Sequence, residues 1–476
     1  MIDNLWRTFH TGNPQTISNS MKNLTDIVFD LDLRYQNNLA YLFDSFTQVV
    51  NINTSMWNTY NIVNMAYLFN GCNNIQYING FNWNCKNLRN FSMAFNGCSS
   101  LQTWITNNWN FYNLRDSGFQ EVFSDCRNLK NIDSSHWNFT QIFNFYKPFY
   151  NCHNLTNLNS TNWGMNYVNN CSMAFMNCFN LQELDTSQWN TYFINDISQM
   201  FCGCYNLNNL NVTNWNTRTL NNLYSTFKDC HTLTALDVSK WNTYYLINSA
   251  SVFVNCYNLN TLNLSNWNLQ QVSDLNSMFA YCNHLTELTW NQSWNVMNLK
   301  TMQSTFAYCD NLTTLNMFNW LTTNLTTLAY TFCGCRNLQS LDISNWNLNN
   351  VTSFTYTFAY CNNLTNASLD NIGKALSKIN AYNKSFNNLY NTNTSGMFRA
   401  CNKYINVNTV ARSTAAALIA NGWILEGELP KAFKITYVKE NTDTPLVYEC
   451  DTYAQVKSFV KQASFKFKDI TIEGEE

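Results

Sequence analysis

Residues 253–278 have the sequence FVNCYNLNTLNLSNWNLQQVSDLNSM, and the chain repeats this pattern of 26 residues over most of its length. The clearest marker is Cys256, because equivalent cysteines recur every 26 residues, with a step of 28 before Cys126 and of 27 before Cys309. A fixed period in this range is typical of a solenoid, in which each unit buries apolar side chains only against its neighbours. The cysteines of this column are Cys72, Cys98, Cys126, Cys152, Cys178, Cys204, Cys230, Cys256, Cys282, Cys309, Cys335 and Cys361.

Other columns of the repeat are apolar. A phenylalanine stands three residues before every column cysteine, Leu or Ile stands three residues after it, and a second aliphatic residue often follows at six. A tryptophan completes the unit, and in residues 253–278 the four positions are Phe253, Leu259, Leu262 and Trp267. These columns predict a continuous core with about five inward side chains per turn.

Around the second Leu of each unit, apolar and polar residues alternate, as in Leu207–Val212, which predicts a short strand that pairs in parallel with its neighbours. The segment before each cysteine, such as 275–279, predicts a helical or 3₁₀ turn on the opposite side. Asparagines two residues after the cysteines, such as Asn154 and Asn206, predict a buried amide ladder at the bend. We expect the extra residues after Trp109 and before Trp294 to lie in loops rather than in strands.

The segment 335–348, CRNLQSLDISNWNL, resembles the leucine-rich repeats of BspA-like bacterial surface proteins and the related repeats of mycoplasma lipoproteins. The patterns FxxCxxL and LDxSxWNxxxV carry the resemblance over about residues 43–370. The resemblance implies a right-handed leucine-rich-repeat solenoid and a role in adhesion or interaction at a cell surface. Because the matching positions are core positions, they specify the fold and leave the partner open.

Composition argues against several classes of partner. The formal net charge is −2 and only 12% of residues are charged, so the sequence offers no electrostatic basis for binding nucleic acid or an anionic membrane. No apolar stretch approaches the roughly 20 residues of a membrane-spanning helix. The first residues lack the basic and apolar segments of a signal peptide, which predicts a chain that folds in the cytosol.

The cysteines are interpreted as buried free thiols that act as small hydrophobic side chains, which suits a reducing compartment. Equivalent cysteines on adjacent turns have parallel Cα–Cβ directions, a poor geometry for disulfides. The pairs Cys202/Cys204 and Cys333/Cys335 are five turns apart and therefore cannot share one metal ion. We predict no metal site and no cofactor.

The ends of the chain depart from the repeat. Residues 1–42 are predicted to form an N-terminal cap, 43–370 the solenoid, and 371–428 a C-terminal helical cap with helices at 372–379 and 413–420. An isolated FxxC motif, Phe398 to Cys401, lies within this second cap. The more highly charged residues 429–476 predict a small ββαβ module, with strands at 433–438, 446–450 and 465–472 and a helix at 452–463.

No catalytic motif is found. The five histidines are scattered, and the chain contains neither a Gly-rich phosphate loop nor the GxSxG or HExxH patterns. The sequence therefore predicts a non-enzymatic protein.

One candidate binding surface is the column one residue after the cysteines. Exposed rings in this column are suited to contact sugar rings or a protein partner, and the alternative is lateral packing that joins adjacent turns. A nearby band of aromatic residues includes Tyr60, Tyr112, Tyr167, Tyr192, Phe193, Tyr244 and Tyr245. The column comprises Arg127, His153, Phe179, Tyr205, His231 and Tyr257.

A second candidate is the column seven residues after the cysteines, where acids alternate with neutral residues. Carboxylates stacked about 5 Å apart would repel by roughly 1–3 kcal/mol, and the alternation relieves this cost. The two interpretations are a solvated hydrogen-bonded ladder and a calcium-binding stripe on the strand face. The column includes Asp133, Asn159, Asp185, Asn211, Asp237 and Asn263.

These features favour a recognition or adhesion solenoid whose partner is a protein or a cell-surface glycan. Three roles are considered: a surface or receptor-binding component of a phage virion, a BspA-like cell-surface adhesin, and an intracellular scaffold. A virion protein would fold in the host cytosol and reach the exterior on lysis, with a terminal module as a possible attachment point to a larger assembly.

Overall fold

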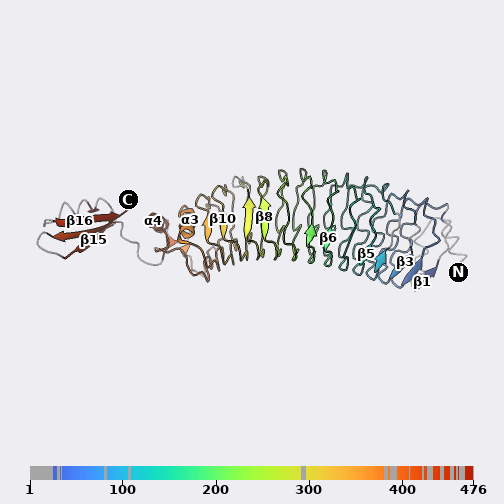
Figure 1. The fold of residues 1–476 in the computed structure, drawn as a ribbon, viewed down its shortest axis with the longest axis horizontal. Helices are drawn as coiled ribbons and strands as arrows, with labels where there is room; N and C mark the ends of the chain where they lie inside the picture. The colour runs from blue at the N-terminus through green and yellow to red at the C-terminus, as the bar shows by residue number, and fades with distance from the viewer. Residues whose placement is uncertain are drawn as a thin grey trace.

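The computed structural model describes residues 25–28, 33, 35–79, 83–104, 109–290, 296–379, 384–385, 394–406, 408–420, 423–425, 433–439, 444–450, 455–456, 459 and 467–474. These residues form an elongated coil, with a separate three-stranded sheet beyond its C-terminal end (Figure 1). Short strands lie side by side along the coil: β1 Asp26–Val28, β2 Asn51–Asn53, β3 Tyr77–Asn79, β4 Thr103–Trp104, β5 Asn131–Ile132, β6 Glu183–Leu184, β7 Asn209–Leu210, β8 Thr261–Leu264, β9 Glu287–Trp290, β10 Thr314–Asn316 and β11 Ser340–Asp342.

The strands pair in parallel and one repeat apart, as the sequence predicts. Leu262 of β8 lies opposite Leu288 of β9, and Leu315 of β10 lies opposite Leu341 of β11. The second Leu of each unit is inside the coil, and its neighbours along the strand face solvent. The solenoid prediction is therefore confirmed at the level of strand register.

The segment before each cysteine is a chain of tight turns and not a helix. Alternate N–H groups leave the turn along the coil axis, so that Ser277 N–H donates to the Gln303 carbonyl (2.9 Å) and Tyr281 N–H to the Ala307 carbonyl (2.7 Å). The N–H groups between them close turns locally, as Cys282 does with Phe279 (3.1 Å). In a helix all N–H groups point along the helix axis, so none would remain to join the next turn.

This geometry requires left-handed backbone. From the unit of Cys72 to the unit of Cys361, the residues five and one before the cysteine all have positive φ, and most of them are not glycine. A non-glycine residue in this region costs roughly 1–2 kcal/mol. The hydrogen bonds between turns offset that cost, since each left-handed residue directs its own N–H to the next unit.

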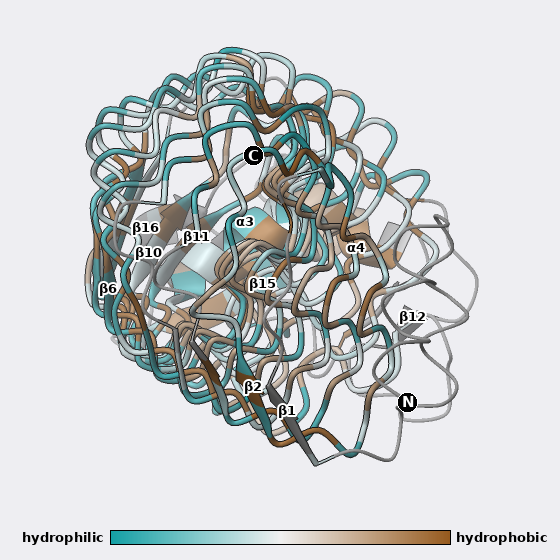
Figure 2. Ribbon diagram, turned by 90° about the vertical axis from the view of Figure 1, so that its right-hand side faces the viewer, coloured by the Kyte–Doolittle hydropathy of each residue, from teal (hydrophilic) through white to brown (hydrophobic). Residues whose placement is uncertain are grey.

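Stacked rings and thiols fill the interior. Phe227, Phe253 and Phe279 stack at centroid distances of 5.6 and 5.9 Å with nearly parallel planes. The Cys256 thiol donates to the Phe227 carbonyl one turn back (3.1 Å), and the same contact recurs for every column cysteine. In the end view, apolar segments of successive turns stack on one another through the coil (Figure 2). Burial and thiol hydrogen bonds thus confirm the interpretation of the cysteines as core residues.

At the N-terminal end the repeat extends further than the sequence suggests. Ile27 of β1 pairs with Ile52 of β2, inside the predicted cap. Phe46 takes the place of the column cysteine and Phe43 that of the column phenylalanine, and both are buried. The cysteine marker therefore begins one unit later than the coil itself.

At the C-terminal end a helix replaces the strand. Helix α3 (Asn366–Leu376) is capped by Thr365 and covers β11, where the Ser368 hydroxyl accepts from Leu341 N–H (3.0 Å) and donates to the Gln339 carbonyl (2.8 Å). The cap prediction placed this helix at 372–379, but it begins at the residue after Thr365. Helix α4 (Arg412–Ala420) packs against α3.

The isolated FxxC motif belongs to the coil. Phe398 stacks on Phe358 at 5.1 Å, and the Cys401 thiol donates to the Phe358 carbonyl (2.9 Å). Residues 394–401 therefore add one more tight-turn corner after the excursion through α3. The short strands β12 (Lys384–Ser385) and β13 (Trp423–Ile424) pair in parallel with each other.

The last module is an antiparallel sheet in the order β15-β14-β16, made of β14 (Phe433–Lys439), β15 (Leu446–Cys450) and β16 (Phe467–Gly474). Ile435 and Val456 are buried in a small core of their own, flanked by Tyr437 and Phe459. Gln455, Val456 and Phe459 are helical, and the rest of the expected helix at 452–463 lies outside the described residues. The boundaries of the four predicted regions remain predictions.

The two extra residues after Trp109 form a bulge at 116–118, away from the strands, as expected. Gly118 keeps the bulge in register, since its carbonyl accepts from Phe91 N–H (2.8 Å). A Cβ on Gly118 would lie 2.6 Å from the Arg89 carbonyl oxygen and 2.8 Å from that of Arg115, closer than atoms can approach. The extra residue before Trp294 lies outside the described residues.

We expect Gly118→Ala to destabilise the protein by about 1–3 kcal/mol, because the new methyl group meets two backbone oxygens that cannot move aside without breaking the ladder. Urea unfolding of the full chain measures the change. Ser117→Ala, at the exposed neighbouring position, is the matched control and should change stability by less than about 0.5 kcal/mol. Equal stability of the two variants would contradict this account of the bulge.

Candidate recognition surfaces

The column after the cysteines is a continuous stack of five rings on five successive turns. The centroid distances are 4.3 Å from His153 to Phe179, 4.7 Å from Phe179 to Tyr205, 4.7 Å from Tyr205 to His231 and 4.8 Å from His231 to Tyr257. All planes are nearly parallel except the last pair, which is tilted by 31°. We call these five residues the ring stack.

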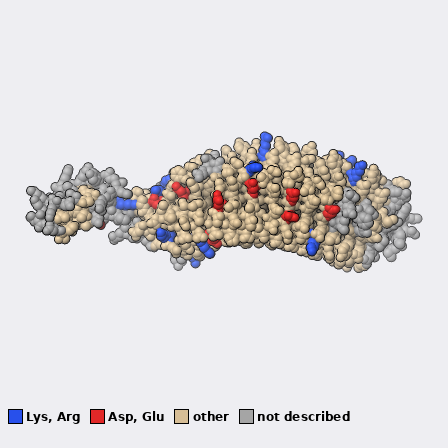
Figure 3. Space-filling view, viewed as in Figure 1, with Lys and Arg blue, Asp and Glu red and all other residues tan. Residues whose placement is uncertain are grey.

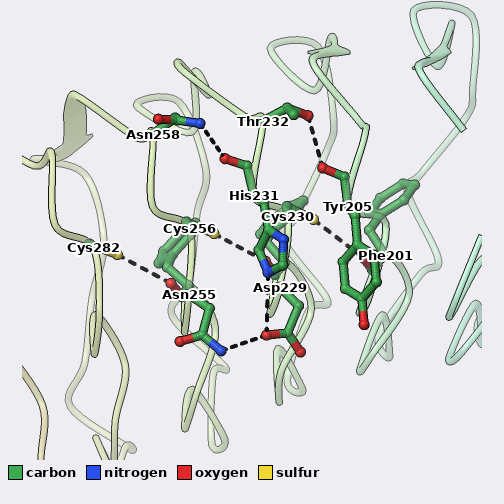
Figure 4. A network of polar contacts seen from close by, with 12 residues as sticks. Phe201, Tyr205, Asp229, Cys230, His231, Thr232, Asn255, Cys256, Asn258 and Cys282 are labelled. Carbon is green, nitrogen blue, oxygen red and sulfur yellow. Dashed lines mark hydrogen bonds and ion pairs between the residues drawn. The ribbon is translucent and has the colours of Figure 1, made fainter. Parts of the chain in front are cut away.

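A second row of polar side chains runs beside the ring stack, one residue before the cysteines (Figure 4). Asp229 accepts from the Asn255 amide (2.6 Å), and its carboxylate lies 3.9 Å from the His231 Nε2. Further along, the Asn177 amide donates to Asn151 (2.8 Å), as part of the same row. Neighbouring turns thus fix the backbone from which the rings project.

At the N-terminal end of the stack, Arg127 forms an ion pair with Asp125 (3.3 Å) and does not continue the rings. Partial burial, and then the positive charge of Arg127, lower the pKa of His153 below its usual value. The lower pKa favours the neutral His153 imidazole, which stacks on Phe179 without a charge to desolvate.

The stack leaves ring edges and not ring faces for a partner. The faces of Phe179, Tyr205 and His231 are each covered by the next ring on both sides, while Tyr205 and Tyr257 remain 38% exposed. Lateral packing between turns is thus present, and it closes the inner faces to a stacking sugar. A binding role for the exposed edges stays a prediction.

The asparagines two residues after the cysteines do form a ladder, but on the surface. The Asn206 amide donates to Asn180 (3.2 Å), and Asn180 donates to Asn154 (3.3 Å). Asn154 and Asn206 are exposed, so the expectation of a buried ladder was wrong. Two residues after the cysteine, the chain has turned toward the surface of the coil, so these amides face solvent.

The alternating Asp/Asn column closes turns within its own unit. The Asp185 carboxylate accepts from Ser187 N–H (2.9 Å), and the Asn211 side-chain oxygen accepts from Thr213 N–H (3.2 Å). Hydrogen bonds from the Ser239 hydroxyl and then the Ser239 N–H lower the pKa of the Asp237 carboxyl. The same contact to the residue two positions on occurs at Asp133, Asn159, Asp237 and Asn263. Local turn closure explains why both Asp and Asn fit this column.

On the strand face this column borders a polar hollow. Its walls include Asn159, Glu183, Asp185, Asn209 and Asn211, on three successive turns. Glu183 and Asp185 supply its two carboxylates, and the other oxygen donors are neutral. Among the described residues, no three side chains of His, Cys, Asp or Glu converge on a possible metal position.

We expect calcium not to bind this stripe, because calcium takes six to eight oxygen ligands and the Asp185 oxygen is already held by its own turn. Calorimetric titration of the full chain with calcium chloride should give no binding heat, and calcium should leave the thermal midpoint unchanged. Heat that disappears in the Asp185→Asn variant would instead establish a calcium site here.

Sequence reasoning missed part of a second hollow, at the bulge. It is lined by residues of the aromatic band and by charged and amide side chains on three turns: Tyr112, Arg115, Asp116, Thr140, Gln141, Phe143, Asn166 and Tyr167. The step of 28 residues before Cys126 was the signal available in the sequence, since it marks where the regular surface is interrupted.

Few charges appear over the face of the coil in Figure 3. Within the described residues, no helix is both long and apolar enough to cross a bilayer.

The parallel one-repeat register and the inward Leu, Phe and Trp columns define the chain as a leucine-rich-repeat-like solenoid, a class whose fold suits protein interaction or adhesion. The chain belongs to the family described as "Mycoplasma protein of unknown function, DUF285", whose model matches residues 37–163, 169–291 and 286–398.

Solved structures with some likeness include a leucine-rich repeat protein from Bacteroides ovatus, at 14% identity over 65% of this chain and 77% of that one, with a TM-score of 0.31. A second is the plant peptide hormone receptor RGFR1 in complex with RGF2, at 13% identity over 69% of this chain and 72% of that one, with a TM-score of 0.23. No curated protein matches the sequence.

Proposed function

We propose that this protein is a non-enzymatic recognition solenoid that binds a protein partner through the exposed edges of the ring stack. The observation that carries the proposal is the unbroken run of five stacked rings on an otherwise sparsely charged surface. Stacked side chains lose little conformational freedom on binding, because packing between turns already orders them.

The composition of the ring stack supports this role. Tyrosine is enriched among the residues that dominate protein interfaces, and Tyr205 and Tyr257 are both partly exposed. Phe179 supplies apolar area between them, and His231 can donate or accept a hydrogen bond. Such a strip suits an extended segment of a partner that runs along the coil axis.

The Tyr205→Ser/His231→Ser/Tyr257→Ser variant tests the contact. A photo-crosslinking residue is placed at Asn258, whose amide donates to the His231 carbonyl beside the stack (2.8 Å). The full chain is exposed to surface-protein extracts of its source cells and of a host cell line. We expect crosslinked partners in the parent protein and at least a tenfold loss in the triple variant, as expected when an interface loses its central contacts.

Tyr281→Ser is the matched control, because Tyr281 is an exposed ring stacked on Tyr308 at 4.8 Å in a different column. It should keep the crosslinks. If the triple variant keeps them too and only melts at a lower temperature, the ring stack serves solely to join the turns.

The place of display is a further part of the proposal. We propose that the protein acts outside the cell in which it folds, as a surface or receptor-binding component of a phage virion. A cell-surface adhesin is the second candidate, favoured by the family match to mycoplasma proteins. The buried free thiols support folding in a reducing compartment in either case. Mass spectrometry of purified particles and of purified surface fractions decides between the two.

A further inference from the structure

We infer that the hollow at the bulge is a binding site for a neutral saccharide, which goes beyond the proposed protein contact and uses different residues. It lies between the turns that follow Trp109, Trp137 and Trp163. We call it the bulge hollow.

The bulge changes the local hydrogen bonding. Side chains that form hydrogen bonds in regular repeats do not form them here. At the regular corner, Asn90 accepts from Ser92 N–H (3.0 Å) and Asn170 accepts from Ser172 N–H (2.8 Å). Asp116 occupies this column at the bulge, but the equivalent N–H, that of Gly118, donates to the Arg115 carbonyl (2.7 Å) and not to the Asp116 side chain. Among the described residues, nothing donates to the Asp116 carboxylate, which is left available to a ligand.

Gln141 shows the same exception. At equivalent positions the side-chain amide donates to a carbonyl one turn back, as Asn113 does to Lys86 (2.6 Å) and Gln271 to Tyr244 (3.0 Å). Next to the bulge, the Thr140 hydroxyl makes this contact to Tyr112 (3.4 Å). Among the described residues, none forms a hydrogen bond with the Gln141 side chain. Its amide therefore keeps both its donors and its acceptor for a ligand.

The aromatic walls of the bulge hollow are less covered by other rings than the ring stack is. Tyr112 is 53% exposed and makes no ring contact with the described residues. Phe143 and Tyr167 meet at 70° with centroids 6.3 Å apart, so they form a corner, and Tyr167 also stacks on Phe193 at 6.0 Å. Tyr112 and Phe143 thus keep ring faces that no other ring of the described residues covers.

These groups match the chemistry of a pyranose. One side of such a sugar is a patch of C–H groups that packs on an aromatic face, and its rim carries hydroxyls that both donate and accept hydrogen bonds. The Asp116 carboxylate accepts, the Arg115 guanidinium donates, and the Gln141 amide does both; the Asn166 amide nitrogen donates, while its oxygen accepts from Asn190 (3.3 Å). A few convergent polar groups beside aromatic walls are the usual make-up of a small-ligand site.

Charge decides between ligand classes. Arg115 and Asp116 are adjacent in the chain, and both line the hollow, so its net charge is zero. Asp116 would repel a phosphate or an acidic sugar and so offset its attraction to Arg115. An apolar peptide would leave the polar walls without partners at a cost of roughly 1–3 kcal/mol for each buried group.

A glycan array carrying neutral and acidic glycans is the test, with the fluorescently labelled full chain as the analyte. We expect retention on glycans that end in a neutral pyranose, and at least a tenfold weaker signal for Tyr112→Ala and for Asp116→Ala. Both positions are exposed, so thermal melting should show that the variants remain folded.

Tyr244→Ala is the matched control from the same aromatic band, 52% exposed and outside the hollow, and it should bind as the parent does. The Tyr205→Ser/His231→Ser/Tyr257→Ser variant should also keep glycan binding, which separates this site from the proposed protein contact. Retention of acidic glycans alone, no retention of any glycan, or parental binding by folded Tyr112→Ala and Asp116→Ala variants would each overturn the inference.

Discussion

Trp241→Ala is expected to destabilise the coil by about 3–5 kcal/mol, the usual cost of removing a large aromatic side chain from a core. Trp241 is fully buried and stacks between Trp215 and Trp267 at 5.8 and 6.0 Å. Its indole N–H donates to the Val212 carbonyl one turn back (3.3 Å). The change therefore removes two stacking contacts and a hydrogen bond between turns, and it leaves a cavity in the middle of the coil.

The damage should also be local. Because each unit contacts only its neighbours, the loss is expected to concentrate in the adjoining turns. Hydrogen exchange followed by mass spectrometry should show faster exchange over about residues 204–282, with little change near Cys98 and Cys335. Tyr244→Ala, at a 52% exposed position three residues away, is the control and should change stability by about 0.5 kcal/mol or less. Uniform loss of protection along the whole coil would contradict a nearest-neighbour solenoid.

Alkaline pH is expected to unfold the coil steeply between about pH 9 and 11. Burial raises the pKa of the Cys72 thiol to about 12, and burial raises the pKa of Cys126, Cys178 and Cys256 still further. In the unfolded chain these thiols ionise near pH 9, so the unfolded state alone loses protons above that value. Stability is therefore fully present below about pH 9 and is lost as the pH rises toward the folded pKa values.

The size of the effect follows from the number of turns that unfold together. Each buried thiol lowers the free energy of unfolding by about 1.4 kcal/mol per pH unit above pH 9, so a cooperative unit of three turns loses about 4 kcal/mol per pH unit. Urea midpoints measured from pH 7 to 10.5 give the slope. Because tyrosines also titrate in this range, the comparison is with Cys204→Ala/Cys230→Ala/Cys256→Ala, which should show a shallower slope. Identical slopes would show that the thiols do not cause alkaline unfolding.

The repeat made most of the fold predictable. A column that is apolar in every unit must face inward, because an exposed side chain would tolerate variation, and the parallel strands follow from the fixed period. The tight-turn segment was not predictable in the same way. Ser277 and Tyr281 have left-handed backbone only because the next turn supplies carbonyl acceptors, and residue preferences alone do not indicate that partner.

Of the candidate surfaces, the ring stack was predictable in part from the sequence, and the bulge hollow was not. The ring stack was visible as a column of Phe179, Tyr205, His231 and Tyr257, but its closed faces depend on a spacing of under 5 Å that only the coil provides. The bulge hollow needed the structure, since the sequence does not show that the Gly118 N–H donates to the Arg115 carbonyl and leaves the Asp116 side chain without it.

The sequence by itself determined that this protein is a solenoid with a core of stacked Phe, Trp and Cys columns. Equivalent positions are buried in every turn, so apolar residues recur at the period of the repeat. The tertiary structure alone decided which surface groups are engaged and which are free. Hydrogen bonds within and between turns engage many polar side chains of the repeat, and the two inserted residues before Cys126 interrupt that pattern beside Asp116 and Gln141.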